Sequence, residues 1–119
     1  VTCIAGPVDV SGYLRDCHLL CLPSENEGFP VVVMEAAATG RAALVSDHPT
    51  LQNAITPETG WTSRLGDPTN LAAQITQIVN DKSYLTKGVA ARTRAETVFD
   101  REQKDTEILS CVEPWLHLE

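Results

Sequence analysis

Two glutamates, Glu27 and Glu35, are the residues whose type and spacing point most clearly to chemistry. Seven residues separate them, and a Gly-Phe-Pro turn and a predicted helix start at Pro30 lie between them. With Glu35 about five residues inside that helix, the rise along the axis is roughly 7.5 Å, so the two carboxylates can contact different ends of one ligand. Carboxylates accept hydrogen bonds from vicinal hydroxyls, which suits a polyhydroxylated ligand. Spacing alone leaves open the alternative that Glu27 only stabilises the helix start and Glu35 faces water.

The predicted helix start also offers a site for phosphate. Near Pro30, the backbone N–H groups of Phe29, Val31 and Val32 are expected to be free, and the positive end of the helix dipole lies beside them. Both features favour phosphate oxygens. Gly28 allows a ligand to approach the backbone closely, whereas Pro30 donates no hydrogen bond and only sets the turn. The segment therefore predicts a ligand that carries both hydroxyls and phosphate.

Short apolar runs alternate with longer helical patterns, which predicts an α/β Rossmann-like fold, a parallel sheet with helices packed on its faces. In such open sheets ligands bind outside the carboxyl ends of the strands. The predicted strands cover residues 1–4, 19–22 and 42–45, with a further short strand near Trp61. The predicted helices cover residues 9–16, 30–39 and 83–98, with one more that Asp67 caps before Pro68 and a last one that begins near Asp100 and that Pro114 ends or kinks. Gly88 is expected to weaken the helix over residues 83–98.

Composition narrows the class of protein. A chain of 119 residues, 43% of them hydrophobic, fits one globular domain. The net charge of −7 repels polyanions and argues against binding of a nucleic acid backbone. No apolar run approaches the roughly 18 residues that a membrane span requires. No transmembrane segment is therefore predicted, and a cytoplasmic location is expected.

The four cysteines are interpreted as thiols of the core, because they lack the paired spacings of a disulfide framework. They are Cys3, Cys17, Cys21 and Cys111. A metal site built from Cys17, His18 and Cys21 is the less favoured alternative, since a structural zinc site needs four ligands at regular spacing.

Several other residues receive structural interpretations. His48 is predicted to be a solvated loop residue. Trp61 is predicted to be a packing residue rather than a platform for a sugar. The basic run of Lys87, Arg92 and Arg94 is predicted to form a solvated helix face.

Residues 1 to about 99 resemble the carboxyl-terminal, donor-binding domain of retaining glycosyltransferases of the GT-B fold, family 4 (glycosyltransferase group 1). The Glu-x7-Glu element formed by Glu27 and Glu35 is a specific signal within this order of residues. In chain order, the matching residues are Gly6, Asp9-Val10, Tyr13-Leu14, Cys21-Leu22-Pro23-Ser24, Glu27-Gly28-Phe29-Pro30, Met34-Glu35-Ala36, Gly40, Ala43-Leu44-Val45-Ser46-Asp47 and Gly60. The resemblance implies a partial nucleotide-sugar-binding domain over residues 1–119.

The resemblance also implies roles for single residues. Glu35 is expected to hold the ribose hydroxyls, and Glu27 is expected to act as a catalytic residue that contacts hydroxyls of the transferred sugar. Backbone amides at the helix start would contact the donor sugar or its diphosphate. The implied substrate-binding residues are Ser24, Glu27, Gly28, Phe29, Pro30, Val31, Val32 and Glu35, with Gly6, Pro7 and Val8 near the base.

The implied reaction is transfer of a sugar from a nucleotide-diphosphate donor to an acceptor hydroxyl with retained anomeric configuration. The nucleotide sugar is a substrate, and neither a metal nor a separate cofactor is expected. The acceptor would bind through an amino-terminal domain outside these residues, so the isolated chain is expected to be an inactive part of a hexosyltransferase-like parent. The alternative is a non-catalytic nucleotide-binding or assembly module. A sugar-releasing phosphorylase or a sugar-nucleotide epimerase is disfavoured by the Pro-Ser-x-x-Glu-Gly-Phe-Pro pattern.

The chain also departs from the family pattern. Family members commonly carry an Arg and a Lys that neutralise the diphosphate, on a loop that would precede residue 1. The family's first two strands normally lie between the strands that match residues 1–4 and 19–22. Residues 1–4 are therefore expected either to pair directly with residues 19–22 or to leave an apolar edge open. Open edges invite pairing with another chain, so a homo-oligomer or a rearranged first strand is expected.

Overall fold

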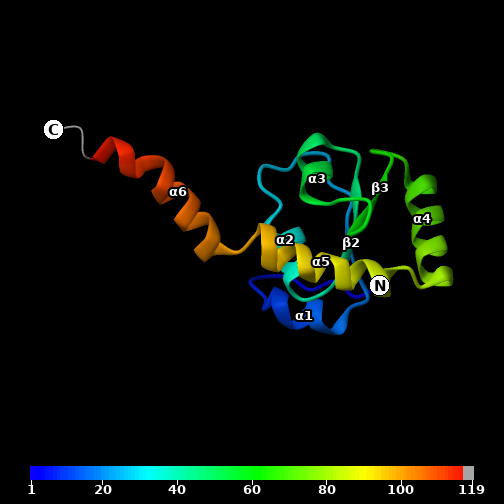
Figure 1. The fold of residues 1–119 in the computed structure, drawn as a ribbon. Helices are drawn as coiled ribbons and strands as arrows, with labels where there is room; N and C mark the ends of the chain where they lie inside the picture. The colour runs from blue at the N-terminus through cyan, green and yellow to red at the C-terminus, as the bar shows by residue number, and fades with distance from the viewer. Residues whose placement is uncertain (117–119) are drawn as a thin grey trace.

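Three parallel strands form the only sheet in the part of the chain that the structure describes, residues 1–116 of a computed structural model (Figure 1). The strands β1 (Leu19–Leu22), β2 (Ala42–Ser46) and β3 (Gly60–Ser63) lie in the order β1-β2-β3. Both pairings are parallel, with Leu20 opposite Ala43 and Val45 opposite Thr62. The predicted strands over residues 19–22 and 42–45 and the one near Trp61 are confirmed.

Six helices are present in the described residues. They are α1 (Val10–Asp16), α2 (Val31–Ala38), α3 (Pro49–Ala54), α4 (Pro68–Asp81), α5 (Tyr84–Val98) and α6 (Arg101–Leu116). Helices α2 and α5 pack against each other and against β2, α4 packs on β3, and α1 packs on α2. Helix α6 extends away from this body, as Figure 1 shows. The predicted helices are thus present, and α6 continues through Pro114 instead of ending there.

Helix α3 was not predicted from the sequence. Its start carries a recognisable signal, since Pro49 is its first residue and the N–H of Thr50 donates to Nδ1 of His48 at 3.3 Å. His48 is half-buried and caps the helix, so the prediction of a solvated loop residue is wrong. A six-residue helix lacks the longer apolar periodicity by which the other helices were found.

The core is centred on β2, in which every residue is buried. Val33 of α2 and Leu51 of α3 pack with Ala43 and Val45 of this strand. Continuous apolar residues are typical of a strand that is covered on both faces, which is the position that β2 occupies. The sheet thereby fixes where the loops that follow β1 and β2 leave the body.

Gly88 permits a close contact between α5 and the backbone that follows α2. A Cβ atom at Gly88 would lie 2.4 Å from the carbonyl oxygen of Gly40, which follows α2. No side chain fits at this distance, so glycine allows α5 to approach the backbone after α2. Beyond this point, Ala91 and Ala95 of α5 pack on Ala37 of α2. Gly88 therefore serves helix packing in addition to any weakening of α5.

The basic residues of α5 form the predicted solvated face only in part, because Arg92 is exposed whereas Lys87 and Arg94 are half-buried. The guanidinium of Arg92 donates a hydrogen bond to the carbonyl oxygen of Ala38, at the end of α2. The ammonium group of Lys87 lies 4.9 Å from the centre of the Trp61 ring. A basic run in the sequence does not reveal the carbonyl groups and rings of neighbouring elements that its side chains contact.

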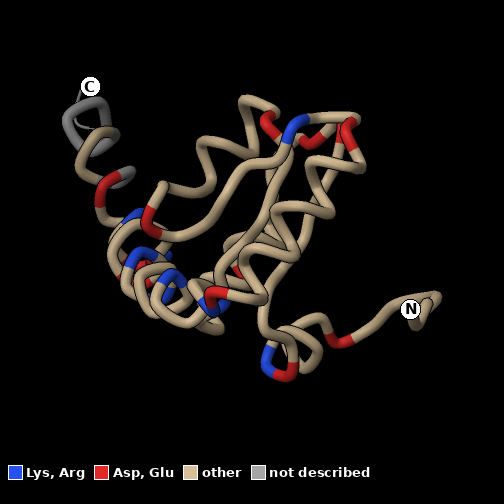
Figure 2. The backbone as a smooth tube through the Cα atoms, turned by 90° about the vertical axis from the view of Figure 1, so that its right-hand side faces the viewer, with Lys and Arg blue, Asp and Glu red and all other residues tan. Residues whose placement is uncertain are grey.

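Residues 1–4 do not form the predicted strand. They belong to an extended arm, residues 1–8, that pairs with no strand among the described residues and has only exposed side chains. Figure 2 shows the arm leading away from the body. Of the two expected outcomes, the second is found within residues 1–116, where β1 pairs only with β2. An apolar sequence alone does not therefore determine whether a segment joins a sheet.

The cysteines do not lie in the core as predicted. Cys3, Cys21 and Cys111 are exposed and Cys17 is half-buried. Within residues 1–116 no group of three His, Cys, Asp or Glu side chains is placed to hold a metal ion. No helix in that range is long and apolar enough to cross a membrane.

Candidate functional site

The loop between β1 and α2, residues 23–30, is the segment in which most predicted site residues lie. It leaves the carboxyl end of β1 and is tied to the end of β2, because the hydroxyl of Ser46 donates to the carbonyl oxygen of Ser24 at 2.6 Å. Ser46 is almost fully buried, at 1% exposure. The loop therefore starts from a fixed point at the carboxyl edge of the sheet.

The start of α2 has no side-chain cap. Pro30 is buried at the N-cap position, and the Phe29 side chain is 72% exposed. The N–H of Val31 donates to the carbonyl oxygen of Phe29 at 2.8 Å, so this amide is not free as predicted. For the amides of Phe29 and Val32, no carbonyl partner is found in the described part of the chain. Two of the three predicted donors are thus available at the helix tip.

Gly28 has no packing reason to be a glycine. A Cβ atom added there would meet no atom of the chain within 4 Å. Gly6 differs, because its φ of +90° is a backbone conformation that glycine adopts without strain. The open space beside Gly28 is available to a ligand next to the backbone.

Glu27 and Glu35 lie on either side of this tip in the sequence but differ in exposure. Glu27 is half-buried in the loop, whereas Glu35 is exposed on α2. Glu35 follows Val32 by three residues, and residues three apart lie on the same side of a helix. A groove of about 330 Å³ beside β1 is lined by Val32 and by Val8 of the arm. The structure thus brings Val8, from the predicted base-binding turn, to the side of α2 that carries Val32 and Glu35.

A second cavity, of about 320 Å³, lies beside the start of α2 on the side of α3. Phe29, Pro30 and Met34 line it together with Asn53 of α3 and Phe99. Neither Glu27 nor Glu35 contributes to this cavity. It is mostly apolar and offers no carboxylate to a sugar, so it does not unite the two predicted acids.

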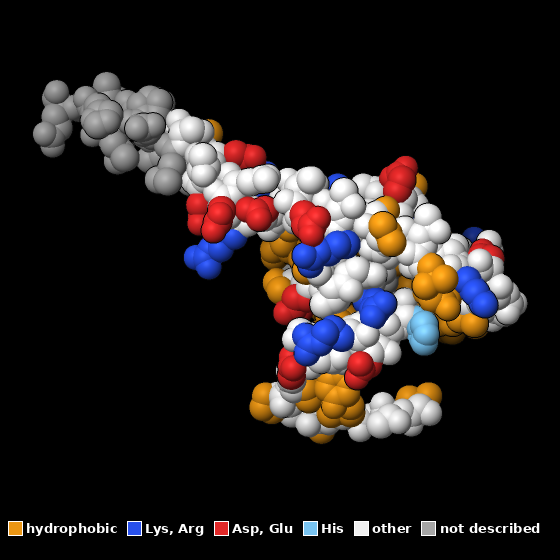
Figure 3. All heavy atoms as spheres, turned by 60° about the horizontal axis from the view of Figure 1, so that its bottom comes forward, with side chains coloured by type: hydrophobic (Ala, Val, Ile, Leu, Met, Phe, Trp, Pro, Cys, Tyr) orange, Lys and Arg blue, Asp and Glu red, His pale blue; other side chains and the backbone are white. Residues whose placement is uncertain are grey.

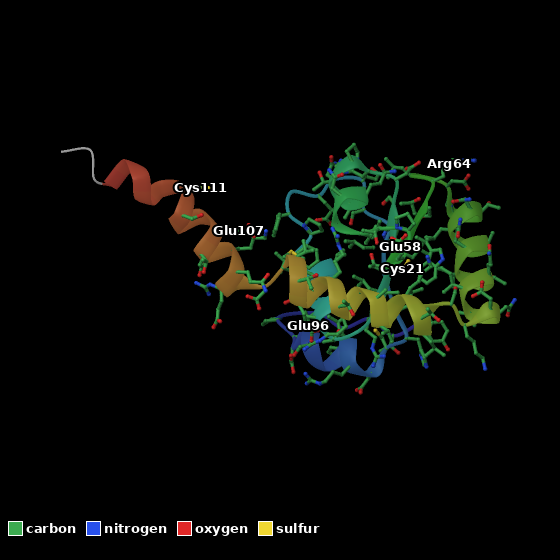
Figure 4. The ribbon with its side chains drawn as sticks, viewed as in Figure 1. Cys21, Glu58, Arg64, Glu96, Glu107 and Cys111 are labelled. Atoms are coloured by element: carbon green, nitrogen blue, oxygen red, sulfur yellow. The ribbon has the colours of Figure 1, made fainter. Side chains whose placement is uncertain are left out.

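A third cavity, also about 320 Å³, lies at the carboxyl ends of all three strands. It is bounded by Glu25 after β1, Ser46 of β2, and Arg64 after β3. Arg64 is paired with Asp67 at 3.1 Å, and Figure 4 shows it at the outer end of β3. The predicted site did not include Arg64; the only sequence signal is its place just after the third strand, where sheet-edge ligands are contacted.

The β2 and β3 ends of this edge are held together by Asp47. Its N–H donates to the carbonyl oxygen of Ser63 at 2.9 Å, and its Oδ1 accepts from the N–H of Leu65 at 2.8 Å. Asp47 therefore has a structural role, in line with its position at the end of β2.

Comparison with known proteins decides the family. Residues 2–81, which contain the whole sheet, both glutamates and the α2 tip, match the family of glycosyl transferases group 1. The chain belongs to this family. The matched part of the glycosyltransferase domain ends with α4, so α5 and α6 lie outside it.

Two curated proteins are similar to this glycosyltransferase domain. It is 31% identical over 101 residues to the amylovoran biosynthesis glycosyltransferase AmsK of Erwinia amylovora, which covers 78% of this chain and 25% of AmsK. It is 51% identical over 39 residues to the N,N'-diacetylbacillosaminyl-diphospho-undecaprenol alpha-1,3-N-acetylgalactosaminyltransferase of Campylobacter jejuni, which covers 33% of this chain and 10% of that protein. The chain thus spans a quarter or less of these relatives.

Two solved structures share the fold. Sucrose-phosphate synthase from Thermosynechococcus elongatus superposes with a TM-score of 0.88 at 26% identity, over 97% of this chain and 30% of that one. HepE of Anabaena, solved in complex with UDP, superposes with a TM-score of 0.80 at 20% identity, over 86% of this chain and 29% of that one. The Rossmann-like α/β fold of the GT-B type predicted from the sequence is confirmed.

Proposed function

We propose that this domain binds a nucleotide-diphosphate sugar and presents it for retaining transfer of a hexosyl group to an acceptor hydroxyl. The acceptor would be held by another part of a longer enzyme, since the relatives are about three to ten times as long as the part that this chain matches. The isolated chain would then bind donor without turning it over. The cytoplasmic location stays a prediction.

The observation that carries this proposal is the uncapped start of α2. The amides of Phe29 and Val32 lack carbonyl partners, Gly28 leaves open space beside the backbone, and the helix dipole adds its positive end. Such a tip favours a diphosphate. The amide of Val31 would join them when it exchanges the carbonyl oxygen of Phe29 for a phosphate oxygen.

The two glutamates would accept hydrogen bonds from hydroxyl groups of the donor on either side of its diphosphate. Glu35 shares a side of α2 with Val32, which lines a groove with Val8. A ribose placed there would donate its hydroxyls to Glu35, with the base toward Gly6, Pro7 and Val8. Glu27, in the loop before the tip, would accept hydrogen bonds from the transferred sugar.

Retention needs no nucleophile from this domain. We propose that the acceptor hydroxyl approaches on the face of the sugar that the leaving diphosphate occupies, so that configuration at the anomeric carbon is kept. The domain's contribution is then to hold the diphosphate and to stabilise its growing charge by backbone donors as the bond to the sugar breaks.

Saturation-transfer NMR with UDP and with UDP-sugars tests the proposal, because the method detects weak ligands. UDP is the first probe, since a protein of the same fold was solved with it. The substitution Glu35→Ala is expected to remove the ribose signals and to weaken binding by about 10- to 150-fold, the equivalent of a charge-assisted hydrogen bond of about 1.5–3 kcal/mol. Glu107→Ala, on the distant α6 (Figure 4), is the matched control and should bind as the parent does.

Two outcomes would contradict the proposal. One is the absence of saturation transfer from this chain to every nucleotide tested. The other is an unchanged ribose pattern in the Glu35→Ala variant. Binding of donor by a complete parent protein that transfers no sugar would instead favour the non-catalytic module.

A further inference from the structure

A cavity of about 490 Å³ lies at the amino end of β3, away from the candidate donor site. It is larger than the cavities beside α2 and at the carboxyl edge, and it falls within the range of about 300–1,000 Å³ that small-molecule sites occupy. Gly60 and Trp61, the first residues of β3, line it together with the turn before this strand. Figure 4 shows Glu58 of that turn and Arg64 after β3 at opposite ends of the strand.

The walls of this cavity come from one internal stretch of the chain, residues 52–87. They include parts of α3, α4 and α5, but no residue of the arm, of β1, of the loop over residues 23–30 or of α2. The cavity therefore depends neither on the first segment of the chain nor on the residues proposed to hold the donor.

The turn that forms one wall is held in place by its own hydrogen bonds. The N–H of Thr56 donates to Oγ1 of Thr59 at 2.8 Å, and the N–H of Gly60 donates to the carbonyl oxygen of Thr56 at 3.1 Å. Thr59 is buried, at 6% exposure. A ligand would thus meet a wall that is already ordered, which lowers the entropy cost of binding.

Trp61 offers the cavity an aromatic ring beside a positive charge. Its side chain is half-buried, and the ammonium group of Lys87 lies 4.9 Å from the centre of the ring. Both residues line the cavity. The ammonium donates to the carbonyl oxygen of Pro57 and lies 3.4 Å from that of Gly60. Since an ammonium group has three N–H donors, one is left for a ligand.

The charge of Lys87 is balanced by its surroundings. Among the described residues that line the cavity, Lys87 alone is charged. Hydrogen bonding by Thr56 and by Ser83 lowers the pKa of Glu58 and of Asp81, and the positive charge of Lys87 adds to this effect, so both carboxylates lie within its electrostatic range. On the face of the molecule that Figure 3 shows, acidic and basic side chains are interspersed and form no patch of one sign. A neutral ligand is therefore favoured over an ionic one.

We propose that this cavity binds a sugar unit of a neutral glycan. The side-chain amides of Gln52 and Gln74 line it, and each offers both a donor and an acceptor, which suits sugar hydroxyls that also donate and accept. The apolar face of the sugar ring would lie on the Trp61 indole, a large and rigid surface. Lys87 would move aside on its flexible side chain and donate to a hydroxyl. The proposed transfer reaction does not require this second carbohydrate site.

Saturation-transfer NMR of the 119-residue chain with maltotriose and cellotriose, two neutral trisaccharides, tests the site. Tryptophan fluorescence in a Trp115→Phe background gives a second readout, because Trp61 is then the only tryptophan of the chain. At least one trisaccharide should bind saturably in both measurements, and UDP should not compete with it.

A pair of glutamines on α4 provides the matched variants. Gln74→Ala is expected to weaken trisaccharide binding by about 2- to 12-fold, the effect of one hydrogen bond between neutral groups. Gln77→Ala removes an exposed amide of the same helix that does not line the cavity, so this variant should bind as the wild type does. Trp61→Ala should abolish binding, with its fold checked by circular dichroism; if it does not fold, the two glutamine variants still decide.

Four outcomes would overturn the proposal. They are no saturable response to either trisaccharide, equal binding by Gln74→Ala and Gln77→Ala, competition by UDP, and binding of adenosine at Trp61 without binding of a trisaccharide. The last would make the cavity a site for a planar base. Since UDP binding at the α2 tip uses none of the residues that line this cavity, either proposal can fail while the other holds.

Discussion

Replacement of Gly88 by alanine sets helix propensity against packing. In an isolated helix the change would stabilise α5 by about 0.8–1.0 kcal/mol, because glycine loses more backbone entropy than alanine. In this fold the new methyl group would lie 2.4 Å from the carbonyl oxygen of Gly40, where 3.4 Å is an ordinary contact. The colliding atom belongs to the backbone, so it cannot rotate away.

The destabilisation from the steric overlap is expected to exceed the stabilisation from higher helix propensity. Relief of the overlap requires α5 to move by about 1 Å from the end of α2, which also loosens Ala91 and Ala95 against Ala37. Overpacking of a core costs about 1–3 kcal/mol, and a rigid backbone partner favours the upper part of that range. After the gain in propensity, Gly88→Ala should lower the free energy of unfolding by about 1–2 kcal/mol and the Tm by roughly 4–8 °C.

Gly12→Ala, the same change in α1, is the control. The added methyl group there would approach only Oδ2 of Asp9, at 3.0 Å, and this carboxylate ends an exposed side chain that can rotate. The variant should gain up to about 1 kcal/mol. Urea and thermal unfolding of both variants, followed by circular dichroism, give the comparison. A Gly88→Ala variant as stable as Gly12→Ala would refute the reasoning.

Three further outcomes are expected. Ser46→Ala removes the hydroxyl that binds the Ser24 carbonyl oxygen and should lower the free energy of unfolding by about 1 kcal/mol while amide exchange in residues 23–30 rises; unchanged exchange would argue against the anchor. Hydrogen bonding by Thr56 and by Ser83, whose backbone N–H donates to Oδ1 of Asp81 at 2.8 Å, lowers the pKa values of Glu58 and Asp81 below their usual 4.5 and 3.8. Their stabilising contribution is therefore present at neutral pH and lost as the pH falls below about 4, so the urea midpoint should drop less between pH 5 and pH 3 in Glu58→Gln with Asp81→Asn than in the wild type. Desolvation raises the pKa of the Cys21 thiol above its usual 9.0. Alkylation of Cys21 at pH 8.5 should thus be slower in the folded chain than in urea, and the folded state should lose stability above about pH 9; equal alkylation rates would contradict the desolvation.

The parts of the fold that follow from local patterns could be predicted from the sequence. The apolar runs of β1 and β2 have the composition of parallel strands, and Asp67 before Pro68 marks the start of α4, where its Oδ1 accepts from the N–H of Asn70 at 2.9 Å. Likewise, Asp100 caps α6 through the N–H of Gln103 at 3.0 Å. These signals lie within a few residues of the structure that they specify.

The features that depend on distant segments could not be predicted. Residues 1–4 have a strand sequence, but whether they pair depends on the position of a sheet edge. Cys21 has the surroundings of a core thiol in the sequence and is exposed because β1 lies at that edge. Arg92 finds its partner, the carbonyl oxygen of Ala38, 54 residues away.

The candidate site also contains features that could be predicted from the sequence and features that could not. The loop, the helix start and the two glutamates were predicted together because they are continuous in the sequence. The N–H of Val31 donates to the carbonyl oxygen of Phe29 because of the geometry of the turn. Residue types do not determine that geometry, so this hydrogen bond could not be predicted. The position of Val8 at the groove that Val32 also lines depends on the packing of α1 against α2. The roles of single residues came from the resemblance to a family, because spacing alone left them open.

Helix α2 is held firmly at only one end. Arg92 binds its last carbonyl group, Gly88 abuts Gly40, and Arg41 donates to the carbonyl oxygen of Leu14 at 2.9 Å and so connects the same corner to α1. The opposite end continues into residues 23–30, which one hydroxyl secures at Ser24. Donors with larger or smaller sugars would consequently be accommodated by reshaping of this short loop, while the axis of the helix keeps its direction. Under the proposed function, substitutions confined to the loop are expected to change sugar preference without disturbing the fold.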